Sequence, residues 1–297
     1  MLLSNADPML TGDVDLFARL KGDALHEPHA VLGAHPGRVG NADGAVVRCF
    51  HPDAVGCTLV ALGETRPMTP LGEGFFACFL PGARLPLDYR LRFHFADGAD
   101  WERDDPYRFL PTLGELDQHL INEGSHRRLW EVLGARVRVA EGTSGVAFAV
   151  WAPSARRVSV VGAFNRWDGR LYPMRALGSS GVWEIFVPGI GAGELYKFEI
   201  KTQDGALRIK TDPMAREMEL PPATASRVNV THYSWGDEAW IAARAGRDVR
   251  REPVSIYEMH MGSWARVPED GNRWLTIGSS RRAWWRTCSA SASPTWS

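Results

Sequence analysis

The sequence predicts a mostly β protein in which two β-sandwiches follow one another along the chain. Apolar and polar residues alternate with a period of two in several short segments, as in strands that bury one face. The alternation is clearest at Val158 and Val160, at Trp183, Ile185 and Val187, and at Tyr196 and Phe198. The chain has 297 residues, enough for two domains of ordinary size. An internal repeat then divides most of the chain into two similar copies.

The repeat consists of matched landmarks at two nearly equal offsets. The segment from Phe50 to Ala54 matches the segment from Trp151 to Ala155 at an offset of 101 (151 − 50). At an offset of 107 (196 − 89), Tyr89 matches Tyr196, Asp97-Gly98 matches Asp204-Gly205, and Asp105-Pro106 matches Asp212-Pro213. Since each copy spans about 100 residues, we expect two immunoglobulin-like β-sandwiches. The six additional residues of the second copy (107 − 101) should lie between its early and late strands.

The additional residues fall where the chain has a loop with the sequence GAFNRWDG, from Gly162 to Gly169. It holds Trp167 next to an amide, Asn165, and a carboxylate. Such a group suits a sugar, because the C–H face of a pyranose stacks on an aromatic ring while its hydroxyls bond to polar groups. The first copy has no aromatic residue in the equivalent segment, Gly63 to Pro67, so we expect that copy to be structural.

Three short helices are expected around the two copies. They are Val14–Lys21, with Asp13 as cap and Gly22 as stop, Leu113–Leu120, and Ser125–Leu133, capped by Ser125. The chain then divides into an N-terminal sandwich, a helical linker, a second sandwich, a further segment and a tail. Their boundaries are 1–112, 113–134, 135–232, 233–276 and 277–297.

The composition argues against several kinds of partner. A formal net charge of −1 gives no electrostatic reason to bind nucleic acid or an anionic membrane, and no apolar run approaches the roughly 20 residues of a membrane helix. The first residues, MLLSNADPML, include no basic one, so we expect no signal peptide. The four cysteines, Cys49, Cys57, Cys78 and Cys288, have no metal-ligand spacing. We therefore expect a cytoplasmic chain with reduced thiols and with neither metal nor cofactor.

The stretch from Phe148 to Phe198, with FAVWAPSA, the FNRW loop, GVWEIFVPG and LYKF, resembles carbohydrate-binding module family 48. The resemblance implies a glucan-binding β-sandwich in which Trp167 and Lys197 face an α-glucan such as glycogen or amylose. Asn165 belongs to the same loop, and Asn229 is a further match.

One departure from that family bears on affinity. A second family tryptophan follows an Asp-Gly turn, where this chain has Leu207. The loss of this aromatic partner predicts weak binding. In the alternative interpretation, Trp167 only caps the sandwich and Lys197 is a solvated strand residue. Trp151 and Trp183 lie within strands, and we expect both in the core.

A later segment, YEMHMGSW from Tyr257 to Trp264, resembles the first barrel strand of 1,4-α-glucan branching enzymes of glycoside hydrolase family 13. HEPHAVLGAH, from His26, and GSHRRLWEVLGA, from Gly124, are similar to the N-terminal domains of those enzymes. The resemblance implies the N-terminal portion of an enzyme of glycogen biosynthesis. That enzyme cuts α-1,4 glucan and transfers the chain to a 6-hydroxyl by a retaining mechanism that uses two carboxyl groups. Val254–Met259 would be the first strand of a truncated (β/α)8 barrel.

No catalytic residue is assigned in this chain. A (β/α)8 barrel needs roughly 250 residues, whereas 44 residues remain from Val254 onward (297 − 253). The family's catalytic Asp, Glu and Asp would lie on later strands, so we expect the chain to be inactive by itself. Glu258 and His260 share one face of the expected strand at the base of the barrel, where we expect them to be structural.

The tail, from Ile277 to Ser297, is unusual: it has six serines, three tryptophans, no acidic residue and no helical period. Codons can be chosen for it that, with one base inserted after Thr276, encode YRELAARLVAYVQRFGFTHVE, a helix followed by the approach to a second strand. We therefore expect a frameshifted, truncated branching-enzyme product, monomeric but prone to aggregate through its exposed strand and tail. The alternative is a stand-alone, non-catalytic glycogen-binding module.

Overall fold

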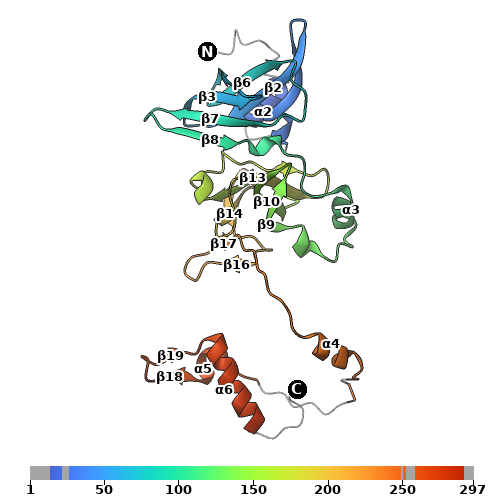
Figure 1. The fold of residues 1–297 in the computed structure, drawn as a ribbon, viewed down its shortest axis with the longest axis vertical. Helices are drawn as coiled ribbons and strands as arrows, with labels where there is room; N and C mark the ends of the chain where they lie inside the picture. Colours follow the sequence, from blue (N-terminus) through green and yellow to red (C-terminus); the bar gives the residue numbers. More distant parts are fainter. Residues whose placement is uncertain (1–13, 22–26, 249, 252–257, 291–297) are drawn as a thin grey trace. The chain divides into compact units, whose positions relative to one another are not determined.

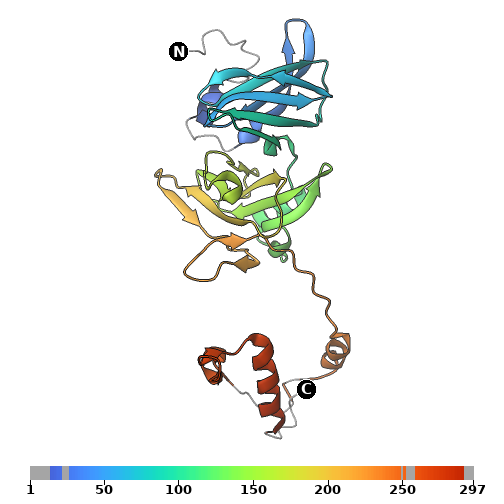
Figure 2. The same ribbon diagram turned by 60° about the vertical axis from the view of Figure 1, so that its left-hand side comes forward.

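The computed structural model of the chain describes residues 14–21, 27–248, 250–251 and 258–290. The chain forms two units, Met1–Thr231 and His232–Ser297. The larger unit contains two β-sandwiches that follow one another along the chain (Figures 1 and 2). The predicted fold class, mostly β with tandem sandwiches and short linking helices, is confirmed for this unit.

Two four-stranded antiparallel sheets form the first sandwich. One has the order β1 (Gly33–Val39), β2 (Ala42–Phe50), β6 (Phe75–Pro81), β5 (Thr69–Gly72), and the other has the order β4 (Glu64–Pro67), β3 (Ala54–Ala61), β7 (Tyr89–Phe95), β8 (Asp100–Asp104). The core between them includes Leu59, Tyr89 and Phe93. Helix α2 (Val14–Lys21) has the predicted bounds, and a short turn, η2 (Pro28–Ala30), follows it. Asp13 and Gly22 lie outside the described residues.

The second sandwich has the same design. One sheet has the order β12 (Arg175–Ala176), β13 (Val182–Pro188), β10 (Thr143–Trp151), β9 (Gly134–Ala140). The other has the order β11 (Arg157–Gly162), β14 (Leu195–Lys201), β17 (Ser226–Arg227), β16 (Glu217–Met218), with β15 (Leu207–Lys210) also paired to β14. Phe148, Tyr196 and Phe198 are fully buried in the core between the two sheets.

The strand orders confirm the sequence repeat. The order β1-β2-β6-β5 in the first sandwich is the order β9-β10-β13-β12 in the second. Strands β2 and β10 end at Phe50 and Trp151, while β6 and β13 end at Pro81 and Pro188. The offset therefore changes from 101 to 107 between these strands, and the loop that follows β11 holds the additional residues.

The linker between the sandwiches departs from the prediction. Helix α3 (Glu115–Glu123) replaces the expected helix Leu113–Leu120, between the short turns η3 (Pro106–Arg108) and η4 (Leu129–Glu131). The expected helix Ser125–Leu133 is wrong, because Gly124 ends α3 in the left-handed conformation (φ 75°). The Ser125 and His126 N–H groups both donate to Leu120 O, and the Ser125 hydroxyl bonds to Glu123 instead of capping a new helix.

The second sandwich is also more enclosed than a period-two pattern predicts. Strands β11 and β13 are buried along nearly their whole length, on both faces. The linker starts earlier than its predicted bound, at residue 109. It covers the outer face of β13, where the rings of Phe109 and Phe186 meet edge to face with centroids 4.7 Å apart. On the same face, the Glu184 carboxylate pairs with Arg175 and accepts hydrogen bonds from the N–H (3.2 Å) and hydroxyl (2.6 Å) of Thr112.

The smaller unit contains α4 (Glu238–Ala245), α5 (Met261–Trp264), the antiparallel pair β18 (Arg266–Val267) and β19 (Arg273–Trp274), and α6 (Ile277–Ala290). Most of the expected strand Val254–Met259 lies outside the described residues. Glu258 and His260 are exposed and belong to no strand, and in the described part of this unit a parallel neighbour for such a strand is lacking.

Helix α6 lies in the tail, whose sequence shows no helical period. The Thr276 hydroxyl oxygen accepts the Ser279 N–H at 3.2 Å, an N-cap contact.

Candidate functional site

The loop from Gly162 to Gly169, hereafter the Trp167 loop, begins with a short turn, η5 (Ala163–Asn165), directly after β11. Arg166 and Trp167 then both adopt the left-handed conformation, with φ of 56° and 61°. Few residues other than glycine do so, and two in succession are unusual. The Trp167 N–H donates to Gly162 O at 2.9 Å, so the loop closes back on its own first residue.

Asn165 is the residue that fixes this conformation. Its side chain is completely buried. Its Oδ1 accepts the Gly162 N–H at 2.8 Å, while its Nδ2 donates to Val160 O at 2.9 Å and Asp168 O at 3.3 Å. The expectation that Asn165 contacts sugar is therefore corrected: its amide has no exposed atom to offer, and its role is to hold the loop.

Trp167 has its side chain at the surface, 41% exposed. The next residue, Asp168, forms an ion pair with Arg170, whose Nη2 lies 2.6 Å from Oδ2. The hydrogen bond from Arg170 lowers the pKa of the Asp168 carboxyl, so that side chain is ionised at neutral pH. An exposed indole thus lies beside charged groups on a loop with a fixed backbone.

Pairing in the sheet brings the predicted site residues to one end of it. Gly162, the last residue of β11, pairs with Tyr196 near the start of β14, and Leu195 pairs with Arg227 at the end of β17. The Trp167 loop, Lys197 and Asn229 therefore all lie at this end.

Lys197 and Asn229 both have polar partners there. Lys197 donates from Nζ to the Thr224 hydroxyl at 2.7 Å. The Asn229 Nδ2 donates to Glu217 at 2.5 Å, and its Oδ1 accepts from the Thr231 hydroxyl at 2.6 Å. Both side chains are only partly covered, and each keeps hydrogen-bonding capacity for a ligand.

The position of the missing second tryptophan lies further along the same sheet. Leu207 pairs with Lys201, and Ile209 pairs with Glu199. Because directly opposed residues and alternate residues share a face, Leu207 and Ile209 lie on the face that carries Lys197. Both are 57% exposed. This face is therefore apolar at the family's second aromatic position but has no ring there.

The two strand tryptophans differ, and one prediction is wrong. Trp183 is 3% exposed and belongs to the core, as expected, but Trp151 is 57% exposed. Trp151 shares the outer face of β10 with Ala147 and Ala149, which the linker covers, and it lies at the end of the strand. Its indole Nε1 donates to Ser180 O at 3.1 Å.

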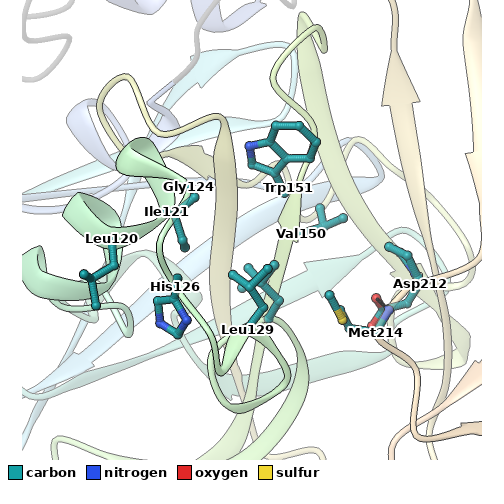
Figure 3. Close-up of a pocket in the computed structure, with 12 residues that line it drawn as sticks. Leu120, Ile121, Gly124, His126, Leu129, Val150, Trp151, Asp212 and Met214 are labelled. Carbon is teal, nitrogen blue, oxygen red and sulfur yellow. Dashed lines mark hydrogen bonds between the residues drawn. The ribbon is translucent and has the colours of Figure 1, made fainter.

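Sequence reasoning also missed a hollow beside Trp151 (Figure 3). The hollow has a volume of about 350 Å³ and lies between α3, the turn after it and the second sandwich. Most of its lining is apolar, with Leu120, Ile121, Leu129, Val150, Trp151 and Met214. One sequence signal points to this hollow. Trp151 lies two residues after Ala149 in β10, so the two side chains share the outer face of the sheet.

Among the described residues, no three His, Cys, Asp or Glu side chains come together as possible metal ligands. No helix within the described ranges is both long and apolar enough to cross a membrane.

The fold and the family matches together define a class of protein: tandem β-sandwiches of which the second is similar to carbohydrate-binding modules. Residues 132–215 match the family described as carbohydrate-binding module 48 (isoamylase N-terminal domain). Residues 13–107 match the family described as the N-terminal domain of alpha-1,4-glucan branching enzyme GlgB. The chain is thus the N-terminal region of a homologue of 1,4-alpha-glucan branching enzyme GlgB.

Curated relatives agree with these matches. The chain is 51% identical over 249 residues to 1,4-alpha-glucan branching enzyme GlgB 1 of Streptomyces coelicolor, covering 83% of this chain and 31% of that enzyme. It is 50% identical over 256 residues to the GlgB of Rhodococcus jostii, covering 85% and 34%. The chain thus spans about a third of the length of these relatives. A solved structure, pullulanase type I from Bacillus subtilis complexed with maltose, overlaps with a TM-score of 0.29 at 16% identity, over 69% of this chain and 28% of that one.

Proposed function

We propose that this chain binds α-glucan, such as glycogen or amylose, at the sheet end that carries Trp167 and Lys197. The observation that carries the proposal is the Trp167 loop, where the buried Asn165 amide holds a left-handed backbone and leaves the indole 41% exposed. A residue held in a sparsely populated conformation by its surroundings is typical of binding sites. The indole face suits the C–H face of a glucose ring, and the Lys197 ammonium can donate to its hydroxyls.

The affinity should be modest. Leu207 and Ile209 extend the same face with apolar side chains, but neither supplies a second ring. A missing aromatic partner removes about 0.5–1.5 kcal/mol of ring contact. Asn229, at the same sheet end, adds a polar group that can reach a neighbouring sugar hydroxyl.

Affinity electrophoresis in gels that contain glycogen tests this proposal. The full chain should be retarded relative to a glycogen-free gel, Trp167→Ala should abolish the retardation, and Lys197→Ala should reduce it. Trp130→Ala is the matched control, since Trp130 is 56% exposed and lies in the turn η4, outside the strands β11, β14 and β17. Retardation of Trp167→Ala equal to that of the unaltered chain would place binding elsewhere.

We further propose that the chain is the glucan-holding N-terminal part of a branching enzyme and performs no branching by itself. Its relatives carry the name 1,4-alpha-glucan branching enzyme, and about two thirds of their length lies outside the shared segment. Retaining glycosyl transfer needs a nucleophilic carboxylate and an acid, and neither is assigned here. Iodine staining of amylose incubated with the purified chain should stay unchanged; any α-1,6 linkage formed would contradict this.

We also propose a reducing, cytoplasmic location and a monomeric chain. Cys49, Cys57 and Cys78 are free and buried, with the Cys49 thiol 3.6 Å from Cys57 Sγ, and two unlinked thiols this close suit a reducing compartment. Thiol titration of freshly isolated, denatured protein should find all four cysteines reduced. Sedimentation should give a monomer at low concentration and larger species as the concentration rises.

A further inference from the structure

We propose that Trp101, in the first sandwich, is a positioning residue for the Trp167 loop, so that glucan binding by the second sandwich depends on the first. The inference rests on the proposed glucan-binding function of that loop. It revises the expectation that the first copy is only structural.

The direct contact is between Trp101 and Arg166. Trp101 lies on β8, and the Arg166 guanidinium carbon is 4.3 Å from the centroid of its ring. A guanidinium at this distance over an indole face makes a favourable cation–π contact. Arg166 immediately precedes Trp167, and both residues are in the left-handed conformation. The first sandwich thus holds the Arg166 side chain, and the side chain of the next residue, Trp167, is the proposed glucan contact.

Trp101 is itself held firmly in the first sandwich. It is half-buried, and its ring meets Phe95 edge to face with centroids 5.2 Å apart. The centroid of the buried His51 ring lies 6.2 Å from that of Trp101, also in an edge-to-face arrangement. Arg166 therefore rests on a ring whose position is set by packing.

The segment after the loop has its own anchors in the first sandwich. The Tyr107 hydroxyl lies 3.3 Å from the carbonyl oxygens of Leu171 and Pro173, and an Arg103 Nη1 donates to the Tyr172 hydroxyl at 2.8 Å. The chain is therefore fixed against the first sandwich both within the loop, at Arg166, and just after it.

These contacts explain why the loop keeps its conformation. Residues in the left-handed region persist only where the surroundings over-determine them. The Asn165 amide holds the loop by hydrogen bonds to the backbone of Gly162 and Val160. The Trp101 ring holds it through its contact with Arg166. Without the ring, the loop should sample other conformations, and the Trp167 indole should spend less time in the orientation that binds glucan.

The test compares variants of the full chain by calorimetric titration with maltoheptaose. Trp101→Leu keeps apolar volume but removes the ring face, and a cation–π contact of this kind predicts a rise in Kd of roughly three- to tenfold. Trp101→Phe should restore most of the affinity. Arg166→Ala should match Trp101→Leu, and the double variant should be no worse than either, because both remove one interaction. Trp130→Leu is the matched control.

A second measurement separates positioning from general destabilisation. Hydrogen exchange of the Trp167 amide, which donates to Gly162 O, should speed up in Trp101→Leu while exchange in β10 and β13 stays unchanged. Unaltered affinity and exchange in both Trp101→Leu and Arg166→Ala, with binding lost in Trp167→Ala, would overturn this inference and leave the glucan site intact. Unaltered affinity in Trp167→Ala would instead overturn the glucan site, and this inference with it.

Discussion

The Tyr196 hydroxyl donates a hydrogen bond to the buried carboxylate of Asp212 at 2.5 Å, and Tyr89 makes the same bond to Asp105 at 2.6 Å in the first sandwich. In both copies, the other carboxylate oxygen accepts the backbone N–H two residues further on. A central strand, β7 or β14, is thereby tied to the segment that follows β8 in the first sandwich and β15 in the second. The matched Tyr and Asp residues of the sequence repeat are therefore partners in space.

We expect Tyr89→Phe to destabilise the chain. The change leaves a buried carboxyl oxygen of Asp105 without its donor, which costs about 1–3 kcal/mol. Urea unfolding measured against Tyr233→Phe, a control at a side chain 68% exposed, should show this difference. Equal stability of the two variants would mean that water replaces the phenol.

The stability contributed by Asp105 should depend on pH. Burial raises the pKa of Asp105 to about 6, above the value of about 3.9 for an unfolded chain. The folded protein therefore binds the Asp105 proton more tightly than the unfolded chain does. The contribution of Asp105 to the free energy of unfolding is complete below about pH 4. As the pH rises from about 4 to 6, that free energy falls by about 3 kcal/mol.

Comparison with Asp105→Asn isolates this titration, because the histidines are common to both chains. The free energy of unfolding of the unaltered chain minus that of the variant should fall from pH 4 to pH 6 and stay level from pH 6.5 to pH 8. A difference that does not vary with pH would show that Asp105 titrates normally.

Glu184→Ala should be among the most damaging single changes in the second sandwich. It leaves Arg175 buried without its carboxylate and Thr112 without its acceptor, and breaking a buried pair costs about 3–5 kcal/mol. Glu102→Ala, which removes solvent-exposed pairs with Arg90 and Arg92, should change thermal stability little. Similar melting temperatures for the two variants would refute the structural role of Glu184.

The two strand tryptophans should respond differently to truncation. Trp183→Ala removes a core side chain that is 3% exposed and should cost about 3–5 kcal/mol. Trp151 is 57% exposed, so Trp151→Ala should cost far less in the same denaturant titration. A large loss at Trp151 would show that its indole bond to Ser180 and its contacts in the hollow outweigh its exposure.

Much of the fold was predictable because the information is local. Period-two alternation locates β11, β13 and β14, and the repeat predicts that the sheets of the two sandwiches share one strand order. The wrong predictions have different causes. The helix Ser125–Leu133 fails for a local reason, the left-handed Gly124, whereas the exposure of Trp151 depends on what a distant segment covers. Trp151 has the same sequence pattern as a core residue, and the linker stops just short of it.

The candidate site, too, could be predicted from the sequence only in part. Trp167 and Lys197 could be proposed from their residue types and a family resemblance. The role of the buried Asn165 amide could not be predicted, because its hydrogen bonds depend on the orientation of the Gly162 N–H and the Val160 carbonyl group. Trp101 was missed because it lies in the other copy, 65 residues before Arg166 (166 − 101).

The packing of the linker on β13 sets a limit on how this module can be moved between proteins. Phe109 and Thr112 precede the second sandwich in sequence, yet they supply part of its wall, against Phe186 and Glu184. A recombination breakpoint at residue 132, where the similarity to carbohydrate-binding module 48 begins, would leave an aromatic ring and a carboxylate bare. A transferable unit built on the second sandwich must therefore begin upstream of Phe109.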